Sequence, residues 1–549
     1  MNTAKMRKGF TVSFMKFMLV IGILVVLAAM AVPQFSSYRA RSSTATRYEV
    51  DYAEPSLVRV YTSESPTDAA VAPFNTEEYD RIYENRFKEV SKNPLSTFSI
   101  DVDTASYSNV RRFILRNQTP PRDAVRIEEM INYFNYDYPR PEGEDPFSII
   151  TESSQCLWNP GNRLIHIGLQ GKSLNTLDLQ PCNLVFLIDS SGSMRAREKL
   201  PLLKKAFRLF LEQLKESDRV AIVAYAGSAG LVLPSTPASH RQRILQAMEN
   251  LRAGGSTAGG AGIRLAYRVA KENLIENGNN RVILATDGDF NVGVSSTSEM
   301  VRLIEEKRRD GIYLTICGFG MGNTKDGRME QISNAGNGNY FYIDNIREAE
   351  KVFVTEMRAT LFTIAKDVKI QVEFNPVKVK AYRLLGYENR LMAREDFNDD
   401  RKDAGELGAG HTVTALYEVM PVGSPAGSSE SAGTSDPLKY QKTRIRTTAS
   451  ESNEIMTIKL RYKRPVEEVS RLVERLVMDQ GTAMDESSEN FRFAAAVAGF
   501  GMLLRDSEFK GNLTYGDVIA LARGSRGRDE HGYRAEFITL VKTCALLFS

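Results

Sequence analysis

The sequence predicts an α/β fold in which a doubly wound, mostly parallel sheet is joined to an antiparallel β-sandwich module, C-terminal helices and a single N-terminal helix of transmembrane type. Apolar runs alternate with helical patterns between residues 183 and 365, which is typical of parallel crossovers. Period-two alternation begins after residue 366 and is typical of antiparallel strands. A mostly apolar stretch covers residues 10–32, long enough for one membrane span.

Short apolar runs predict the strands of the central region, at residues 184–188, 220–225, 230–233, 282–286, 313–317 and 340–343. Helical patterns separate most of them, at residues 199–215, 240–251, 259–277, 298–309, 329–335 and 346–364. Strands that alternate with helices are joined by right-handed crossovers, so the central region is predicted to form a doubly wound sheet.

Three oxygen-bearing side chains follow the first of these strands at alternate positions: Asp189, Ser191 and Ser193. Oxygen ligands of this hardness suit Mg²⁺, Mn²⁺ or Ca²⁺ rather than zinc. One carboxylate and two neutral hydroxyls do not neutralise a divalent ion, so further ligands are expected from elsewhere in the chain. The alternative is a strand-to-helix turn in which these side chains cap a helix without a metal.

Two more ligands are predicted from later segments. Thr257 lies in a Gly-rich turn, and Asp287 ends the apolar run at residues 282–286. Because the carboxyl ends of parallel strands meet at one crevice, ligands from different strands converge there. The side chains expected around one cation are Asp189, Ser191, Ser193, Thr257 and Asp287. Their two carboxylates balance the ion's charge and leave a coordination position for an acidic side chain of a partner.

The segments DSSGSM, GGSTAGGAGI and LATDGDFNVG, in this order, resemble the metal-ion-dependent adhesion site (MIDAS) of von Willebrand factor type A (VWA) domains, which have a Rossmann-like sheet. The resemblance implies that Ser191, Ser193 and Thr257 coordinate the cation directly. It implies that Asp189 and Asp287 bind directly or through water. Asp289 is a further candidate, and the alternative for it is an exposed loop acid.

Composition and the absence of other motifs exclude several other classes of protein. With 71 Lys and Arg against 68 Asp and Glu, the formal net charge is +3, and the well-mixed charges offer no basic face for nucleic acid. The four histidines are not clustered and none lies near the motif, so no zinc or catalytic signature is present. Neither GxSxG nor a Walker A motif occurs, and the glycines of residues 318–322 lack the helix and ribose acid of a nucleotide site. We expect no enzyme.

The four cysteines form no CxxC motif. Cys317 and Cys544 lie in apolar segments and are expected to be core thiols. Cys156 and Cys182 have the option of pairing if the chain is exported, and the sequence leaves this open.

The N-terminal stretch has three interpretations. Lys5, Arg7 and Lys8 precede the apolar run and are expected to stay in the cytoplasm. The run is either an uncleaved anchor or a signal peptide cleaved after Ala31. In the third interpretation, the segment from Lys8 resembles the leader junction and helix of type IV pilins and pseudopilins. All three export the bulk of the chain, so we expect a cell-envelope protein that is membrane-anchored or surface-exposed.

The pilin resemblance implies cleavage after Gly9, which leaves Phe10 as the new N-terminus and places the helix in a filament core. The acidic residue of that family is replaced here by Phe14. In the family this acid pairs with the terminal amine of a neighbouring subunit. A subunit at a filament tip has no earlier neighbour, so its loss is compatible with a tip position.

The domains predicted along the chain are an N-terminal helix (1–35), a stalk (36–93), an α+β region that contributes strands to a β module (94–182), the VWA domain (183–365), a β-sandwich module (366–465) and a helical C-terminal region (466–549). A hairpin at residues 147–169 and the module after the VWA domain are expected to pair in space. The VWA domain is then an insertion into a β-sandwich.

Helices are also predicted at residues 75–90, 466–479, 488–504, 515–522 and 533–547. The apolar end of the helix at 488–504 is too short to span a membrane and is expected to be buried. The Asp101–Asp103 pair is either a second cation site or, as we favour, one exposed acid and one helix cap.

From residue 94 onward the chain resembles a group of bacterial exported VWA proteins, many of them anchored to a membrane. We therefore expect a module that binds a partner protein through Mg²⁺ (or Mn²⁺ or Ca²⁺), with an exposed Asp or Glu of the partner completing the coordination. Further partners are the membrane, through the N-terminal helix, and pilus or pseudopilus subunits. The alternative is a structural or assembly component of a pilus or secretion machine in which the metal is only structural.

Overall fold

The computed structural model describes residues 76–100, 103–174, 179–255, 259–288, 297–424 and 452–548. The chain divides into two compact units, Met1–Val71 and Ala72–Ser549, and all described residues belong to the second. Within these residues, no helix has both the length and the apolar character needed to cross a membrane. The predicted membrane-type helix at residues 10–32 lies outside the described residues, as does the predicted stalk up to residue 75.

A six-stranded sheet forms the centre of the region predicted to be a VWA domain, in the order β10-β9-β8-β5-β6-β7. Its strands are β5 (Cys182–Asp189), β6 (Arg219–Tyr225), β7 (Ala229–Pro237), β8 (Asn279–Thr286), β9 (Ile312–Phe319) and β10 (Tyr340–Ile343). All the pairs are parallel except β6–β7. The connection between β6 and β7 is too short for a crossover, so these two strands form an antiparallel hairpin.

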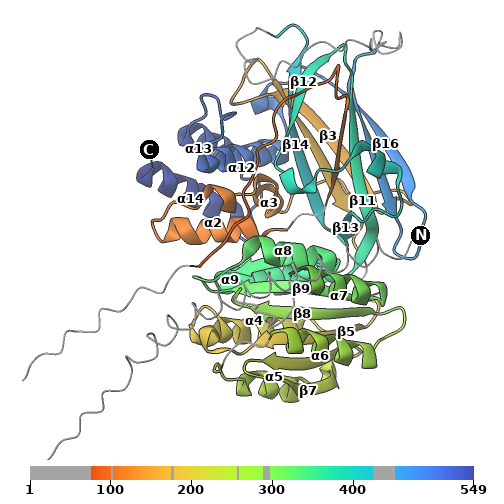
Figure 1. The fold of residues 1–549 in the computed structure, drawn as a ribbon. Helices are drawn as coiled ribbons and strands as arrows, with labels where there is room; N and C mark the ends of the chain where they lie inside the picture. The colour runs from red at the N-terminus through yellow and green to blue at the C-terminus, as the bar shows by residue number, and fades with distance from the viewer. Residues whose placement is uncertain are drawn as a thin grey trace, which may run out of the picture. The chain divides into compact units, whose positions relative to one another are not determined.

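Helices cover both faces of this sheet (Figure 1). They are α4 (Leu200–Glu212), α5 (Arg241–Asn250), α6 (Gly259–Glu272), α7 (Thr297–Arg309), α8 (Asp326–Ala335), α9 (Ile346–Glu350) and α10 (Met357–Leu361), with a π-helix at Lys351–Glu356. Leu184, Phe186 and Ile188 of β5 pack in the cluster that contains α4 and α5. Val185 and Leu187 point to the opposite face, toward α6, α7 and α8. This two-residue alternation explains the continuous apolar run, because both faces of the strand are buried.

Two further sheets form a sandwich around one apolar core. One has the order β1-β12-β14-β4-β3; in the other, β13-β11-β15-β16, strand β2 also pairs with β11. The strands are β1 (Lys88–Glu89), β2 (Leu95–Ser99), β3 (Phe147–Gln155), β4 (Arg163–Gly171), β11 (Thr363–Phe374), β12 (Val379–Leu385), β13 (Gly405–Gly408), β14 (Thr412–Pro421), β15 (Glu454–Lys463) and β16 (Arg471–Met478). Because β4 pairs with β14, the hairpin before the VWA domain and the module after it share one sheet, as predicted.

The remaining helices pack together beside the sandwich (Figure 1). They are α2 (Ala105–Leu115), α3 (Ile127–Asn132), α12 (Glu489–Arg505), α13 (Tyr515–Gly524) and α14 (Tyr533–Leu547). Helix α12 is buried along most of its length, which confirms the predicted buried helix at its apolar end.

Two predicted helices are wrong. Residues 76–87 are not helical, and the backbone N–H groups of Thr76 and Glu78 bond to Gly322 and Thr324 of the VWA domain. Residues 471–478, predicted as helix, form the edge strand β16 instead. In both segments a backbone from elsewhere in the chain offers hydrogen-bond partners, and this tertiary pairing overrides the local helical pattern.

Candidate metal centre

The sheet brings the two predicted carboxylates to the same edge. Strands β5 and β8 are adjacent and parallel, with Ile188 opposite Ala285, so Asp189 and Asp287 follow at neighbouring strand ends. Both side chains are buried. Burial raises the pKa of Asp189 and the Asp287 carboxylate raises it further, against the lowering effect of hydrogen bonds from Ser191. Two buried like charges at one edge are the arrangement that a divalent cation stabilises.

Three groups fix the Asp189 carboxylate. Its Oδ1 accepts the backbone N–H of Ser191 at 2.9 Å. Its Oδ2 accepts the Tyr225 hydroxyl and the Thr286 hydroxyl, each at 3.2 Å. Sequence reasoning missed Tyr225 and Thr286. Both are the last residues of strands that flank β5, and this position is the signal that could have identified them.

The two serines of the motif do not act as helix caps. Ser191 precedes a short 3-10 helix, Gly192–Arg195, yet its side chain makes no capping hydrogen bond. The Ser191 and Ser193 hydroxyls lie 2.9 Å apart instead. Ser191 is buried and Ser193 is exposed, so the motif runs from the interior to the surface. This arrangement disfavours the interpretation of the turn as a metal-free cap.

The Gly-rich turn lies against the motif. The N–H of Gly254 donates to the carbonyl of Ser190 at 2.8 Å, and that of Gly192 donates to the carbonyl of Gly255 at 3.1 Å. Gly255 has a φ of 83°, which favours glycine at this position. Thr257 follows this turn but lies outside the described residues, as does Asp289. Their predicted roles as ligands therefore stay predictions.

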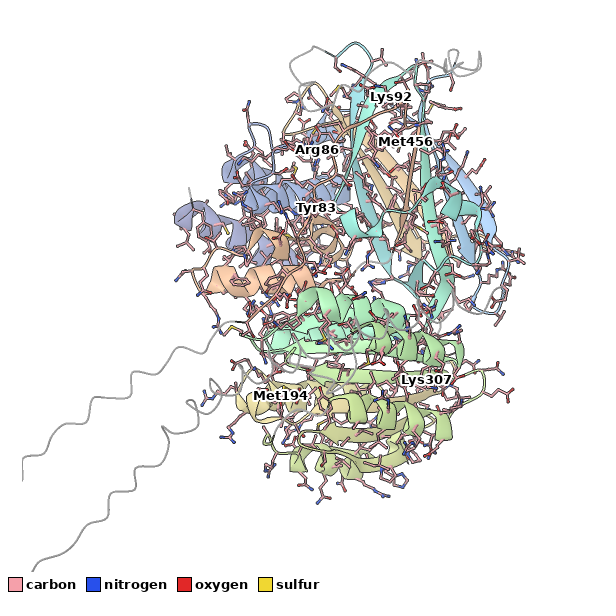
Figure 2. The ribbon with its side chains drawn as sticks, viewed as in Figure 1. Tyr83, Arg86, Lys92, Met194, Lys307 and Met456 are labelled. Atoms are coloured by element: carbon pink, nitrogen blue, oxygen red, sulfur yellow. The ribbon has the colours of Figure 1, made fainter. Side chains whose placement is uncertain are left out.

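Lys199 also reaches the site and was missed by sequence reasoning. Its ammonium donates to Asp287 Oδ2 at 2.8 Å and lies 3.5 Å from Asn323 Oδ1. Sequence reasoning placed Lys199 only at the start of a helix. Met194, labelled in Figure 2, follows the serines and is buried in the core of the domain, which holds the motif to the sheet.

The donor set fits a hard divalent cation. Two carboxylates and two hydroxyls come from the ends of adjacent strands, and none of the four is a soft ligand. Hydrogen bonds from Tyr225 and Thr286 fix the orientation of the Asp189 carboxylate, a feature that good metal sites share.

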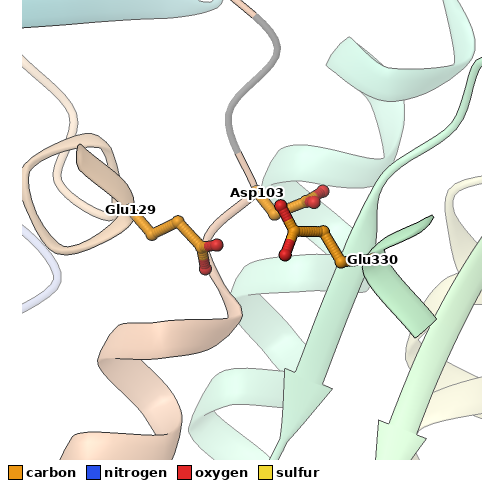
Figure 3. A group of neighbouring side chains, drawn as sticks. All are labelled: Asp103, Glu129 and Glu330. Atoms are coloured by element: carbon orange, nitrogen blue, oxygen red, sulfur yellow. The ribbon is translucent and has the colours of Figure 1, made fainter. Parts of the chain in front are cut away.

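A second group of acids is held differently (Figure 3). Asp103, Glu129 and Glu330 have ligand atoms within 4.8 Å of one another, and all three are buried. Arg126 bonds to Glu129, while Arg390 Nη2 lies 2.7 Å from Glu330 Oε1. We call these five residues the carboxylate–arginine network.

The network corrects one interpretation of the sequence. Asp103 does not cap the following helix, whose N-cap is Thr104. Its Oδ1 accepts the backbone N–H of Tyr340 at 2.7 Å, and Asp101 lies outside the described residues. The network joins α3 and α8 to the start of α2, so it connects the VWA domain to the elements around it.

All four cysteines are free and buried. Cys156 packs among the helices beside the sandwich, whereas Cys182 belongs to the VWA core. The pairing that the sequence left open is therefore not formed.

The fold and the site define a VWA-domain protein: residues 183–355 match the model described as von Willebrand factor type A domain. Residues 73–166 match a von Willebrand factor model, and residues 359–547 match the model "Uncharacterized protein YfbK, C-terminal". The YfbK protein of Escherichia coli (strain K12) is 40% identical over 506 residues, which cover 89% of this chain and 86% of YfbK. The chain belongs to the YfbK family.

Other similarities are more distant. The protein sll0103 of Synechocystis sp. is 28% identical over 173 residues, or 32% of this chain and 40% of that protein. Among solved structures, a von Willebrand factor type A protein from Catenulispora acidiphila is 16% identical, covers 72% of this chain and 89% of its own, and has a TM-score of 0.38. Proximal thread matrix protein 1 from the mussel byssus, solved with a zinc-occupied MIDAS motif, is 21% identical, covers 32% and 44% of the two chains, and has a TM-score of 0.27.

Proposed function

We propose that the chain is a cell-envelope VWA protein that binds a partner protein through a divalent cation, Mg²⁺ or else Mn²⁺ or Ca²⁺. One observation carries the proposal: buried Asp189 and Asp287 lie at adjacent strand ends, beside serines that lead outward to the exposed Ser193. When bound, the cation supplies a Lewis-acid centre that an Asp or Glu of the partner can coordinate.

The residues of the chain prepare this contact. Tyr225 and Thr286 hold the Asp189 carboxylate in place, so its orientation does not have to be fixed at the moment of binding. Burial of Asp189, Asp287 and Ser191 keeps water from one side of the site. An oxygen–cation contact that is partly shielded from water is stronger than an exposed ion pair.

We infer binding rather than catalysis. A hydrolase that used this metal would need a general base beside it. Among the described residues, the ring of His166 bonds to the Tyr138 hydroxyl in the sandwich and not to a residue of the metal centre.

A structural role for the metal is the second candidate. The ion pair between Lys199 and Asp287 already neutralises one of the two carboxylates, so the edge of the sheet is in part stabilised without an ion. In that case the chain acts as an assembly component of a pilus or secretion machine, and its N-terminal helix carries the function.

Partner capture distinguishes the two candidates. The full chain is used to capture envelope proteins in Mg²⁺ and in chelator, next to Asp189→Ala and the surface control Asp310→Ala in the same domain. The proposal expects a partner that chelator and Asp189→Ala both release and that Asp310→Ala retains. Capture that survives chelation and Asp189→Ala favours the structural role.

The N-terminus tests localisation and the pilin-like tip position. We propose membrane or filament attachment through residues 10–32, with the bulk of the chain outside the cytoplasm. Mass spectrometry of the mature protein distinguishes the three routes: a chain that begins at Phe10 indicates pilin processing, at Val32 a signal peptide, and at Met1 an uncleaved anchor.

A further inference from the structure

The Lys199 side chain is buried at the metal centre, and neighbouring residues fix its position. Its side chain is 8% exposed, and its ammonium lies between Asp287 Oδ2 at 2.8 Å and Asn323 Oδ1 at 3.5 Å. The residue precedes α4 directly, so the helix fixes where its side chain starts. A lysine held this way differs from a surface lysine, which keeps its ammonium in water.

The aliphatic part of Lys199 runs along Gly320. A Cβ atom at Gly320 would lie 2.3 to 2.8 Å from three carbons of the lysine side chain, closer than real contacts allow. Gly320 also has a φ of 75°, which favours glycine. The backbone of the loop after β9 therefore leaves a channel that the lysine fills, and this channel directs the ammonium to Asp287.

The charge at the site depends on this lysine. Asp189 and Asp287 together carry −2, and Lys199 reduces this to −1. With a divalent cation bound, these residues and the ion together carry a net charge of +1 when the lysine is present and zero when it is absent. Like charges a few ångströms apart repel, and the repulsion is strong where water is excluded. Lys199 thus opposes the cation but leaves a positive charge for an incoming carboxylate.

We propose that Lys199 is an internal competitor of the divalent cation, which lowers the affinity of the site for metal and raises the affinity of the metal-loaded site for a carboxylate. This inference rests on the proposed function of the same site. Without metal the ammonium pairs with Asp287. When the cation takes Asp287, the ammonium keeps Asn323 as its acceptor. The +1 charge of the loaded site matches one partner carboxylate.

Mn²⁺ binding to the full chain tests whether Lys199 lowers the affinity of the site for metal. Lys199→Met keeps the aliphatic bulk and removes the charge, and the matched control Lys205→Met removes a charge from an exposed position of the same helix. In calorimetry or Mn²⁺ electron paramagnetic resonance, Lys199→Met is expected to bind Mn²⁺ about ten-fold or more tightly than wild type, because one unfavourable charge contact is removed. Lys205→Met is expected to stay within about two-fold.

A carboxylate probe tests whether Lys199 raises the affinity of the metal-loaded site for a carboxylate. With saturating Mn²⁺, acetate is expected to perturb the Mn²⁺ signal at several-fold lower concentration in wild type than in Lys199→Met. Lys199→Arg, which retains the charge, is expected to resemble wild type. If Lys199→Met is unstable by circular dichroism, Lys199→Gln replaces it in both measurements.

The outcomes separate this inference from the proposed function. Equal or weaker Mn²⁺ binding by the neutral variants, with binding by wild type, overturns the role of Lys199 and leaves the metal centre standing. Absence of Mn²⁺ binding in every variant, Lys199→Met included, overturns the metal centre and this inference with it. Tighter Mn²⁺ binding without a change in acetate sensitivity overturns the second half of the inference.

Discussion

The candidate metal centre around Asp189 and Asp287 and the carboxylate–arginine network both gather buried acids, but different groups lie beside those acids. At the metal centre Asp189 accepts only neutral donors among the hydrogen bonds described for it, and a single ammonium, that of Lys199, pairs with Asp287. In the network, the Arg126 and Arg390 guanidinium groups lie between the carboxylates. The difference shows that crowded acids alone do not identify a cation site, because two fixed guanidinium groups already offset two of the three negative charges of the network.

Removal of an arginine from the network should have the largest effect. Arg126→Met leaves the buried Glu129 and Asp326 without their ion pairs, and it should destabilise the fold by about 3–5 kcal/mol. Urea unfolding measures this loss. The control Arg122→Met breaks an exposed pair with Asp506 and should cost no more than about 1 kcal/mol. Full rescue of Arg126→Met by Mg²⁺ would contradict the distinction between the two regions.

Glu128 lies next to Glu129 of the network, and its contribution to the stability of the fold should depend on pH. Burial, and then the charge of Glu388, raise its pKa to about 7, and its Oε2 has no hydrogen-bond partner among the residues that the structure describes. A carboxyl with a raised folded pKa stabilises the fold fully below its ordinary value, and this contribution is lost as pH rises through about 7. Glu128→Gln should therefore match wild type near pH 4 and exceed it by about 3 kcal/mol near pH 8, since one pKa unit corresponds to about 1.4 kcal/mol.

Urea unfolding across this pH range measures the difference, with the exposed Glu350→Gln as the control. If wild type and Glu128→Gln differ equally at both ends of the range, the carboxyl does not titrate near neutrality in the fold.

Metal addition should stabilise only a protein with an intact centre. At 100 times its Kd, Mn²⁺ or Mg²⁺ should raise the free energy of unfolding of wild type by about 2.7 kcal/mol. Asp189→Asn removes a ligand charge and should lose this gain, whereas Asp310→Asn should keep it. Thermal unfolding with and without metal measures the gain, and equal metal-dependent shifts in wild type and Asp189→Asn would place the ion elsewhere.

The smallest effect should come from the loss of one hydrogen bond that orients the Asp189 carboxylate. Thr286→Val keeps the shape of the side chain and removes one hydroxyl donor to Oδ2. The loss of one hydrogen bond to a carboxylate should cost about 1–2 kcal/mol in stability or metal affinity. Calorimetry with Mn²⁺ measures the change in affinity. An effect as large as that of Asp189→Asn would make Thr286 a direct ligand.

The motif could be located from the sequence because its geometry follows from local patterns. The apolar runs in the sequence show where β5 and β8 end. Because these two strands are adjacent and parallel, their ends place Asp189 near Asp287. The sandwich was predictable for the same reason, since alternation continues along β4 and β14. The edge strand β16 was not, because its residues fit a helical pattern as well, and the open side of β15 decided its conformation.

The sequence by itself determined the two carboxylates, the serines and the strands that carry them, because each depends on neighbours within a few residues. Only the tertiary structure showed that Lys199 reaches Asp287, 88 residues away, or that two arginines pair with the acids of the network. Electrostatic balance at a buried site depends on every charge within a few ångströms. Those charges come from segments far apart in the chain, and no local pattern records them.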